Sequence, residues 1–468
     1  MVNPSVVSVQ ESTKENKSSV TLSVEDADDN IMQQTHDPHS MGEHLTAPQA
    51  LMNLIKGNIG TGILSMPVIL KYAGLWTGFI LIALSGALAT YVMGILVHTA
   101  ESVIEEHHLD RTKIDYTEAV FYVFKYGPQK LRKPKGKIKH TVNLFLIITQ
   151  IGFSCVYTLF LTVNLISFLH SFFPHLWLDF YLVAILVCIV LIPLNYTSHM
   201  RILAYVSFVA NMATVLGLIL IFAYLFSYGL KPISTFPVIT NTKDILIGFS
   251  IAVYTFEGIS LVLPIQSKMI RPREFSHPFG VLNVGMIVIV CLNLSLAFFG
   301  FLAFGEDAEG SVTLNIPDEK WFALVKPLFL INIFASYMIQ FYIPASIFGR
   351  LMEKLRCHRE ASERRRYINL KVMRLALILF CYVMVVAIPR LDLMISLIGA
   401  LASSMLAFVI PPTLDLVHWW TRRDQIKCFW FCKFTKDLII IVIGLLSFVG
   451  GTVATLIQII EAFGQPEV

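Results

Sequence analysis

A run of seven residues near the start of the chain, 56–62 (KGNIGTG), places three glycines and a lysine inside an otherwise apolar segment. Glycine weakens a helix interior by about 1 kcal/mol relative to alanine, and it lets the backbone open so that N–H and C=O groups lose their partners. At membrane depth an opened backbone is tolerated only where it is buried in protein or lines a cavity. The run therefore predicts a broken membrane helix whose free backbone groups bind a polar solute.

The break offers groups that suit a carboxylate. The backbone N–H groups of Gly60, Thr61 and Gly62 would stand at the positive end of the half-helix that follows, which favours an anion. A second segment, 256–264 (FEGISLVLP), resembles 60–67 (GTGILSMP) because both contain a Gly-Ile pair and close with a proline. Interrupted helices at corresponding positions of two halves are typical of inverted-repeat transporters with a site near the midplane.

The second break adds candidates for binding an ammonium group. Its free carbonyls around Gly258, with Glu257 and Ser260 nearby, suit a positive charge, so the two breaks together predict a site for an amino acid zwitterion. A carboxylate inside a membrane span is costly to bury, and burial favours its protonated form. Glu257 is therefore the candidate proton-coupling residue. The alternatives are a structural ion pair, with Lys56 as its partner, and a carboxyl group hydrogen-bonded to the opened helix.

Two aromatic residues are candidates for closing the site over the side chain of the solute. Phe256 lies at the second break, and Tyr157 lies in the third apolar segment. For both residues the alternative role is ordinary packing between helices.

Composition sets the class of protein. With 55% hydrophobic residues, 15% charged residues and a mean hydropathy of +0.68, the 468-residue chain is too apolar for a soluble domain of its length. It is predicted to be a polytopic membrane protein in a lipid bilayer. The polar residues within its apolar segments form no metal or nucleophile pattern, and 57–62 matches no phosphate-binding fingerprint. Neither an enzyme, a cofactor nor a nucleic-acid partner is expected.

Eleven apolar segments are long enough to cross about 30 Å of hydrocarbon, which takes about 20 helical residues each. They lie near 50–72, 74–100, 141–169, 180–195, 202–228, 245–265, 279–304, 324–348, 372–388, 393–410 and 438–460. We expect an all-α membrane domain over 47–464. It would be a five-plus-five inverted repeat with broken first and sixth helices, with repeats at about 50–228 and 245–410 and an extra helix at about 438–460.

The charges outside the spans orient the chain. The tail 1–46 is expected to be disordered, because its first 45 residues carry eight acidic residues and two lysines with little apolar clustering. Eleven spans place the two ends on opposite sides of the membrane. The loops on the N-terminal side hold 26 lysines and arginines, and the opposite loops hold four. The positive-inside rule then makes the N-terminal tail cytosolic and 462–468 extracellular or lumenal.

Several runs carry a family resemblance. They are 54–64 (LIKGNIGTGIL), 256–264 with 268–269 (KM), 310–315 (GSVTLN), 340–344 (QFYIP) and 388–393 (IPRLDL). Over 49–464 the chain resembles the proton-coupled amino acid transporters, solute carrier family 36, of the amino acid/auxin permease group. The resemblance implies an eleven-helix carrier that moves small neutral amino acids together with protons.

Two features depart from that family. Its proton-coupled members carry a histidine three residues before the Lys-Gly pair, where this chain has Asn53, which cannot titrate. They also join two extracellular loops by a disulfide, whereas 171–179 and 306–320 contain no cysteine. The fold implied by the resemblance tolerates both changes. Because Asn53 replaces the histidine, whether transport is coupled to protons stays open. Glu257 is the remaining candidate for carrying the proton.

Two other functions stay open beside proton-coupled transport. One is an amino acid uniporter without proton coupling, and the other is a sensor that binds an amino acid and signals through its cytosolic loops. Members of the resembling family occur in the plasma membrane and in lysosomal or endosomal membranes, and the sequence does not distinguish these locations.

An epitope placed after Val468 tests the predicted orientation. On protein shown to be at the cell surface, we expect antibody labelling of intact cells, because an odd number of spans puts this end outside. An epitope at Met1 that needs permeabilisation is the matched control. A C-terminal epitope that is labelled only in permeabilised cells would refute the eleven-span topology.

Overall fold

A computed structural model describes residues 45–132, 135–173, 175, 178–196, 200–317, 319–354, 362–420, 422–425 and 429–464. The predicted tail at 1–46 therefore lies outside the described residues, apart from its last two. Leu45 pairs with Met269, since its N–H donates to the carbonyl of Lys268 at 2.7 Å. Thr46 precedes the first described helix, and its N–H donates to Gln49 Oε1 at 2.9 Å.

The described part of the chain is built from helices. In chain order they are α2 (Ala47–Asn58), α3 (Thr61–Leu64), α4 (Met66–Ala73), α5 (Leu75–His107), α6 (Tyr116–Tyr126), α7 (Gln129–Arg132), α8 (Lys135–Phe172), α9 (Phe180–Tyr196), α10 (Met200–Tyr228), α11 (Thr242–Thr255), α12 (Ile259–Ser267), α13 (Val281–Phe304), α14 (Val312–Asn315), α15 (Val325–Lys354), α17 (Glu363–Ala387), α18 (Leu391–Ile398), α19 (Ile410–Trp420), α20 (Thr435–Leu446) and α21 (Thr452–Gly464). Wider π-helical turns occupy η7 (Gly399–Ser403), η8 (Met405–Val409), η10 (Phe429–Phe434) and η11 (Ser447–Gly451).

Nine helices among the described residues are long and apolar enough to cross a membrane. The predicted first and fourth spans are not among the nine, for two different reasons. The first consists of the short pieces α2, α3 and α4, because the chain opens at its glycines. The fourth corresponds to α9, whose apolar stretch Phe180–Pro193 is shorter. The multi-pass class is thus supported, and eleven spans stay a prediction.

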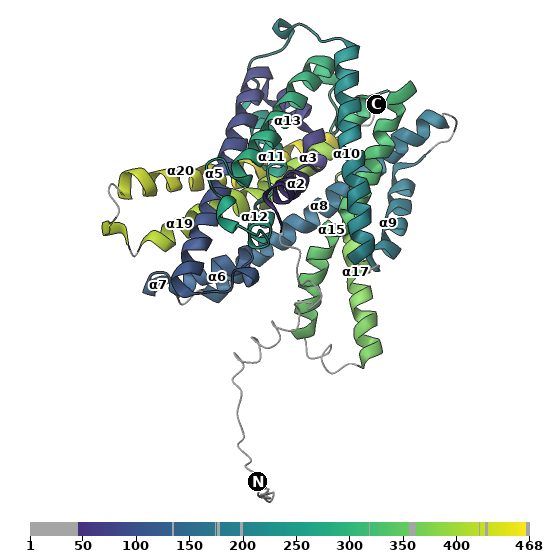
Figure 1. The fold of residues 1–468 in the computed structure, drawn as a ribbon. Coiled ribbons are helices and arrows are strands. Elements are labelled where there is room, and N and C mark those ends of the chain that lie inside the picture. Colours follow the sequence, from purple (N-terminus) through teal and green to yellow (C-terminus); the bar gives the residue numbers. More distant parts are fainter. Residues whose placement is uncertain are drawn as a thin grey trace, which may run out of the picture. The chain divides into compact units, whose positions relative to one another are not determined.

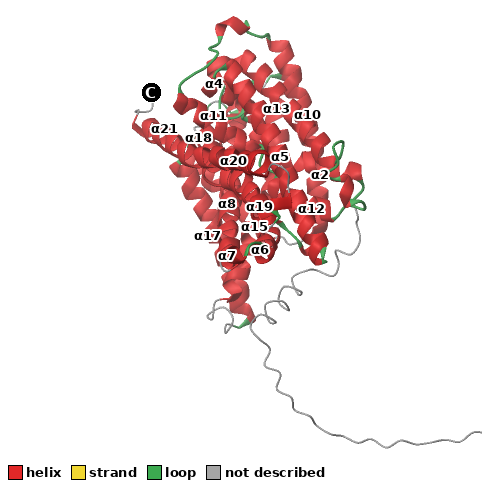
Figure 2. Cartoon of the chain, turned by 90° about the vertical axis from the view of Figure 1, so that its left-hand side faces the viewer, coloured by secondary structure: helices red, strands yellow, loops and turns green. Residues whose placement is uncertain are grey.

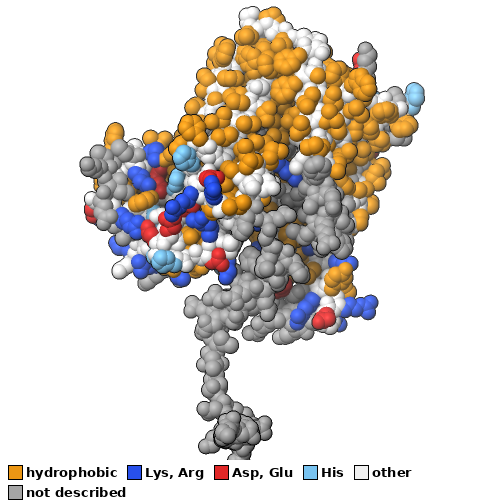
Figure 3. Space-filling model, in the orientation of Figure 1, with side chains coloured by type: hydrophobic (Ala, Val, Ile, Leu, Met, Phe, Trp, Pro, Cys, Tyr) orange, Lys and Arg blue, Asp and Glu red, His pale blue; other side chains and the backbone are white. Residues whose placement is uncertain are grey.

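The outer helices present apolar side chains at the surface. Leu182 and Ile189 on α9, Ile219 on α10 and Val383 on α17 are all more than half exposed. Figure 3 shows a broad apolar face over α10 and α13, whereas charged side chains gather lower down, over α6 and α19. An apolar surface of this extent is stable only against hydrocarbon, so these faces are the lipid-facing ones.

The two broken helices pack against each other in opposite directions. The first half of the second broken helix, α11, contacts α3 and α4, and its second half, α12, contacts α2. This arrangement is antiparallel, because each half meets the opposite half of its partner. α11 also lies beside α5 and α18, near the middle of the helices in Figures 1 and 2. α13 packs on α2, α4 and α5, and α15 packs on α8 and α10.

Glycines allow α11 to sit close to the turns η7 and η11. A Cβ on Gly399 would lie 1.9 Å from the carbonyl oxygen of Ser250, and a Cβ on Gly451 would lie 2.4 Å from Ser250 Oγ. Real Cβ atoms do not approach other atoms so closely. The position of α11 depends on these two close contacts, which are possible only because Gly399 and Gly451 have no side chain. The position of the second break therefore depends on them too.

Replacing Gly399 with alanine tests this dependence. We expect Gly399→Ala to destabilise the protein by about 3 kcal/mol or more, because the new methyl group overlaps backbone of α11. Thermal unfolding of the purified protein in detergent measures the effect. Gly94→Ala is the matched control, since a Cβ there meets no atom within 4 Å. An equal effect of the two substitutions would contradict the packing argument.

Candidate functional site

A cavity with about 500 Å³ of empty space, part of it open to solvent, lies where the two helix breaks meet. Its walls come from both breaks and from α8 and α15. The lining residues are Gly57, Asn58, Gly60, Thr61, Gly62, Gln150, Phe153, Tyr157, Tyr254, Thr255, Glu257, Ser260, Leu261, Gln340 and Ile343. The structure thus brings six predicted residues to one cavity: Gly60, Thr61, Gly62, Tyr157, Glu257 and Ser260.

The first break lies between α2 and α3. Ile59 leaves the helix with φ −94° and ψ 92°, and Gly60 is extended with φ −125° and ψ −149°. The first N–H groups after a break have no carbonyl four residues earlier to bond to, so they are available to a ligand. The backbone from Gly60 to Gly62 borders the cavity. This segment can therefore donate hydrogen bonds to an anionic group.

The two glycines of this break play different roles. A Cβ on Gly60 would meet the hydroxyl oxygen of Tyr157 at 3.1 Å and no other atom within 4 Å. A Cβ on Gly62 would lie 2.9 Å from Cα of Thr255. Gly60 therefore keeps space open beneath Tyr157 at the cavity, whereas Gly62 allows α3 to pack tightly against α11.

The second break lies between α11 and α12 and presents a carboxyl group. Glu257 is 7% exposed, and its Oε2 accepts a hydrogen bond from Ser403 Oγ. Its Oε1 is buried and has no hydrogen-bond partner among the residues that the structure describes. Ser403 reaches Glu257 from the π-helical turn η7. A buried acceptor without a donor is costly, so Oε1 is suited to receive a hydrogen bond from a bound cation or to carry a proton.

Three predicted site residues do not line the cavity. Phe256 is 1% exposed, and its ring lies toward α5, with Cζ 3.2 Å from where a Cβ of Gly86 would be. Gly258 faces Asn58, whose Oδ1 would lie 2.4 Å from a Cβ there, so this glycine lets the two breaks touch. Asn53 is exposed on α2. Only part of the predicted set of site residues therefore lines the cavity.

Polar residues that the sequence reasoning missed complete the walls. Gln150 of α8 and Gln340 of α15 join their side-chain amides by a hydrogen bond. Thr61 Oγ1 and the hydroxyl of Tyr254 are 3.0 Å apart, and the ring of Phe153 meets that of Tyr254 edge-on at 4.7 Å. Glutamine inside an apolar span is a signal that could have identified Gln150 and Gln340, because polar groups in spans commonly mark a solute path.

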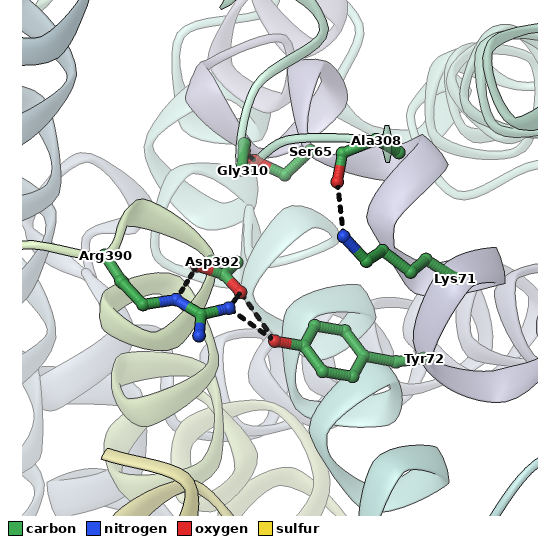
Figure 4. A network of polar contacts seen from close by, with 7 residues as sticks. All are labelled: Ser65, Lys71, Tyr72, Ala308, Gly310, Arg390 and Asp392. Atoms are coloured by element: carbon green, nitrogen blue, oxygen red, sulfur yellow. Dashed lines mark hydrogen bonds and ion pairs between the residues drawn. The ribbon is translucent and has the colours of Figure 1, made fainter. Parts of the chain in front are cut away.

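A charged network lies beyond the cavity, where α4 ends and α18 begins (Figure 4). The hydroxyl of Tyr72 donates to Asp392 Oδ2 at 2.5 Å, and Arg390 Nη2 donates to the same oxygen at 2.8 Å. Asp392 is 7% exposed. Hydrogen bonds to an ionised group are stronger than those between neutral groups, and here two different donors share one carboxylate oxygen. The network therefore fastens α4 to α18.

Two further contacts fasten α4 to the segment between α13 and α14. Lys71 Nζ donates to the carbonyl of Ala308 at 3.0 Å, and Ser65 Oγ donates to the carbonyl of Gly310 at 2.6 Å (Figure 4). A Cβ on Gly310 would lie 2.9 Å from the backbone nitrogen of Asp392. The segment is thus packed between α4 and α18. Together these contacts hold one end of the broken first helix in place.

The apolar helices define a multi-pass membrane protein, and the polar cavity at its two helix breaks is the candidate solute site. Residues 43–457 match the family described as transmembrane amino acid transporter protein. The chain belongs to this family. It is an amino acid transporter and not an enzyme, and the predicted family resemblance is confirmed.

Two relatives resemble this chain over most of their lengths. The probable amino acid transporter skat-1 of Caenorhabditis elegans is 26% identical over 437 residues, which cover 92% of this chain and 94% of that protein. The proton-coupled amino acid transporter-like protein pathetic of Drosophila melanogaster is 29% identical over 436 residues, covering 90% and 87%.

Solved transporter structures resemble the chain more distantly. Mhp1, a nucleobase-cation-symport-1 family transporter in a closed conformation with bromovinylhydantoin bound, has a TM-score of 0.49 at 12% identity and covers 90% of this chain and 92% of its own. MhsT in complex with L-phenylalanine has a TM-score of 0.44 at 13% identity and covers 90% and 99%.

Gly60→Ala tests whether the cavity binds the solute. We expect binding of an amino acid substrate to weaken about tenfold or more, because the methyl group fills space beside Tyr157, and tenfold is about 1.4 kcal/mol. The unfolding temperature should change little. Adding Tyr157→Phe to this variant removes the contacted oxygen and should restore part of the binding. Binding and thermal unfolding of purified protein provide the measurements.

Gly62→Ala is the comparison for this prediction. Its methyl group would press on backbone of α11, so we expect a lower unfolding temperature as well as weaker binding. Unchanged binding by a folded Gly60→Ala protein would place the solute elsewhere.

Proposed function

We propose that this protein carries a small neutral amino acid across the membrane by alternating access, with a proton on Glu257 as the coupling ion. One observation carries the proposal. The cavity between the antiparallel broken helices offers an open backbone at Gly60–Gly62 and a free carboxyl oxygen at Glu257. These groups match the two charges of an amino acid zwitterion.

The walls of the cavity support the choice of a small neutral substrate. Glu257 is the one acidic or basic side chain among the described lining residues, so the cavity matches an ammonium group and holds no partner for a second substrate charge. Phe153, Tyr157, Leu261 and Ile343 limit the space for the side chain. Gln150 and Gln340 offer amides to a polar substrate atom. Asn58, whose Oδ1 is buried and has no hydrogen-bond partner among the described residues, is a further acceptor at the breaks.

Substrate and proton would be linked through Glu257. A bound ammonium group stabilises the carboxylate form, and departure of the substrate leaves a buried carboxyl with Ser403 as its described donor. Protonation then becomes favourable. Because such coupling is reciprocal, substrate and proton each change the affinity for the other. Asn53 contributes less to proton coupling in this proposal, since it is exposed and does not line the cavity.

Alternating access would move one repeat against the other. The repeats are the proposed 50–228 and 245–410, with 438–460 as the extra helix. In this scheme the network of Tyr72, Arg390 and Asp392 acts as the extracellular or lumenal gate, which must open before a solute reaches the cavity from that side. The N-terminal tail then lies in the cytosol, and the membrane is the plasma membrane or a lysosomal or endosomal one.

Purified protein in liposomes tests the proposal with a panel of labelled amino acids and an imposed pH gradient. We expect flux of small neutral amino acids, and a modest rise in uptake when the outer pH changes from neutral to mildly acidic. Glu257→Gln mimics the protonated carboxyl, so it should abolish the pH response. Asn53→His is the comparison variant and should alter the response less.

Each outcome separates the alternatives. Flux that does not depend on pH in the unmodified protein would indicate the uniporter. Binding of an amino acid without any flux would indicate the sensor. A strong acid stimulation that persists in Glu257→Gln would place the proton site on another residue.

A further inference from the structure

A second pair of carboxyl groups lies away from the cavity, between α19 and α20. Asp415 is on α19, and Asp437 is in the first turn of α20, and the two carboxyl groups interact electrostatically. α19 packs against both α20 and α5. Neither residue lines the cavity at the helix breaks. The pair is therefore separate from the proposed substrate site.

Asp415 has the partners that an ionised carboxylate needs. Its Oδ1 accepts a hydrogen bond from Thr99 Oγ1 at 3.1 Å, and its Oδ2 lies 3.0 Å from Lys433 Nζ. Lys433 comes from the turn η10, and its ammonium group also lies 4.6 Å from the centre of the Trp419 ring. Both oxygens of Asp415 are thus satisfied, and its charge is balanced.

Asp437 is in the opposite situation. It is fully buried, and neither of its side-chain oxygens has a hydrogen-bond partner among the described residues. An ionised carboxylate is unfavourable in such a place, because it has lost water and gained no hydrogen-bond donor. A protonated carboxyl avoids this cost if an acceptor is near. The neighbouring carboxylate of Asp415 is such an acceptor.

Two lysines near the pair interact electrostatically with Asp437, but neither donates a hydrogen bond to its oxygens among the described residues. Lys433 is bound to Asp415, and Lys436 is exposed, with its ammonium group 4.7 Å from the centre of the Tyr91 ring of α5. His418 of α19 is hydrogen-bonded to Ser102 Oγ at 3.0 Å and interacts electrostatically with Asp415. The turns η8 and η11, which also pack on α20, contain no titratable residue.

We propose that Asp437 and Asp415 form a second proton-binding site, in which one proton is shared between the two carboxyl groups. Binding takes a proton from water, and release returns it and leaves two carboxylates in one buried contact. Two neighbouring like charges in a buried site repel each other, so release loosens the contact between α19 and α20. The site makes the packing of α20 sensitive to pH, independently of the substrate cavity.

Infrared difference spectroscopy tests the proposal on the full-length protein with Glu257→Gln, so that the cavity carboxyl does not contribute. On raising the pH we expect a protonated carboxyl C=O band to disappear and a carboxylate band to appear. Asp437→Asn should remove this pair of bands. Asp424→Asn is the matched control, because the side chain of Asp424 is 92% exposed, and it should leave the bands unchanged.

Thermal unfolding gives a second readout. If the folded protein holds this proton more tightly than the unfolded chain does, its stability must fall as the pH rises through release. We expect the unfolding temperature to fall in this way in the Glu257→Gln protein and to lose most of that dependence with Asp437→Asn. Labelling with ¹³C-aspartate, which shifts the bands of aspartate only, replaces the variant if Asp437→Asn does not fold.

Three results would overturn the proposal. The first is the absence of a protonated aspartate band at any pH at which the protein is folded. The second is a band that persists in folded Asp437→Asn protein. The third is stabilisation by sodium ions at constant pH that Asp437→Asn abolishes, which would make the pair a metal-cation site. Amino acid flux enters none of these measurements, so they are independent of the proposed transport function.

Discussion

The need to satisfy an opened backbone inside a membrane governs this structure. Two helices break at glycines, and each break frees N–H and C=O groups in a region where water is scarce. The protein meets this need by packing the two breaks against each other and leaving a polar cavity between them. An amino acid, with one negative and one positive group, is the substrate that we propose for this cavity.

Close contacts through glycine hold the breaks in register. Gly62 allows α3 to meet Thr255 of α11, and Gly258 allows the second break to meet the side chain of Asn58. On the far side of α11, Gly399 and Gly451 allow the turns η7 and η11 to reach Ser250. A side chain at these positions would overlap the facing segment, so the segments can pack this closely only because the residues are glycines.

Two of the π-helical turns supply buried polar contacts in the second half of the chain. η7 carries Ser403, which hydrogen-bonds Glu257, and the carbonyl of Leu406 in η8 accepts a hydrogen bond from Tyr116 at 2.8 Å. Wider turns leave carbonyls without their usual partners and change the direction of side chains, which is why they often occur at functional positions. The buried acids Glu257, Asp392 and Asp437 are all placed by this half of the chain or packed against it. Their environments differ, since one faces the cavity, one is paired with Arg390 and one faces another carboxyl group.

Much of the architecture was accessible from the sequence because it depends on local chemistry. Apolar run lengths predicted the membrane class, and the glycines of 56–62 and 256–258 predicted the two breaks that the structure contains. Motifs at these breaks were among those that predicted the family, and the family match over residues 43–457 confirms it. Six residues predicted for the site line one cavity, and five of these lie at or beside the two breaks.

Side-chain directions and long-range partners were decided by the tertiary structure. Phe256 belongs to the break, yet its ring packs toward Gly86, and Asn53 lies on the exposed face of α2. Gln150 and Gln340 are far apart in sequence and meet only because α8 packs on α15. The pairing of Asp415 with Asp437 likewise requires α19 to pack on α20. Composition and spacing determine which residues can occupy a membrane and where a helix must open, whereas which side chains meet depends on how separate helices pack, and that is not encoded within any one segment.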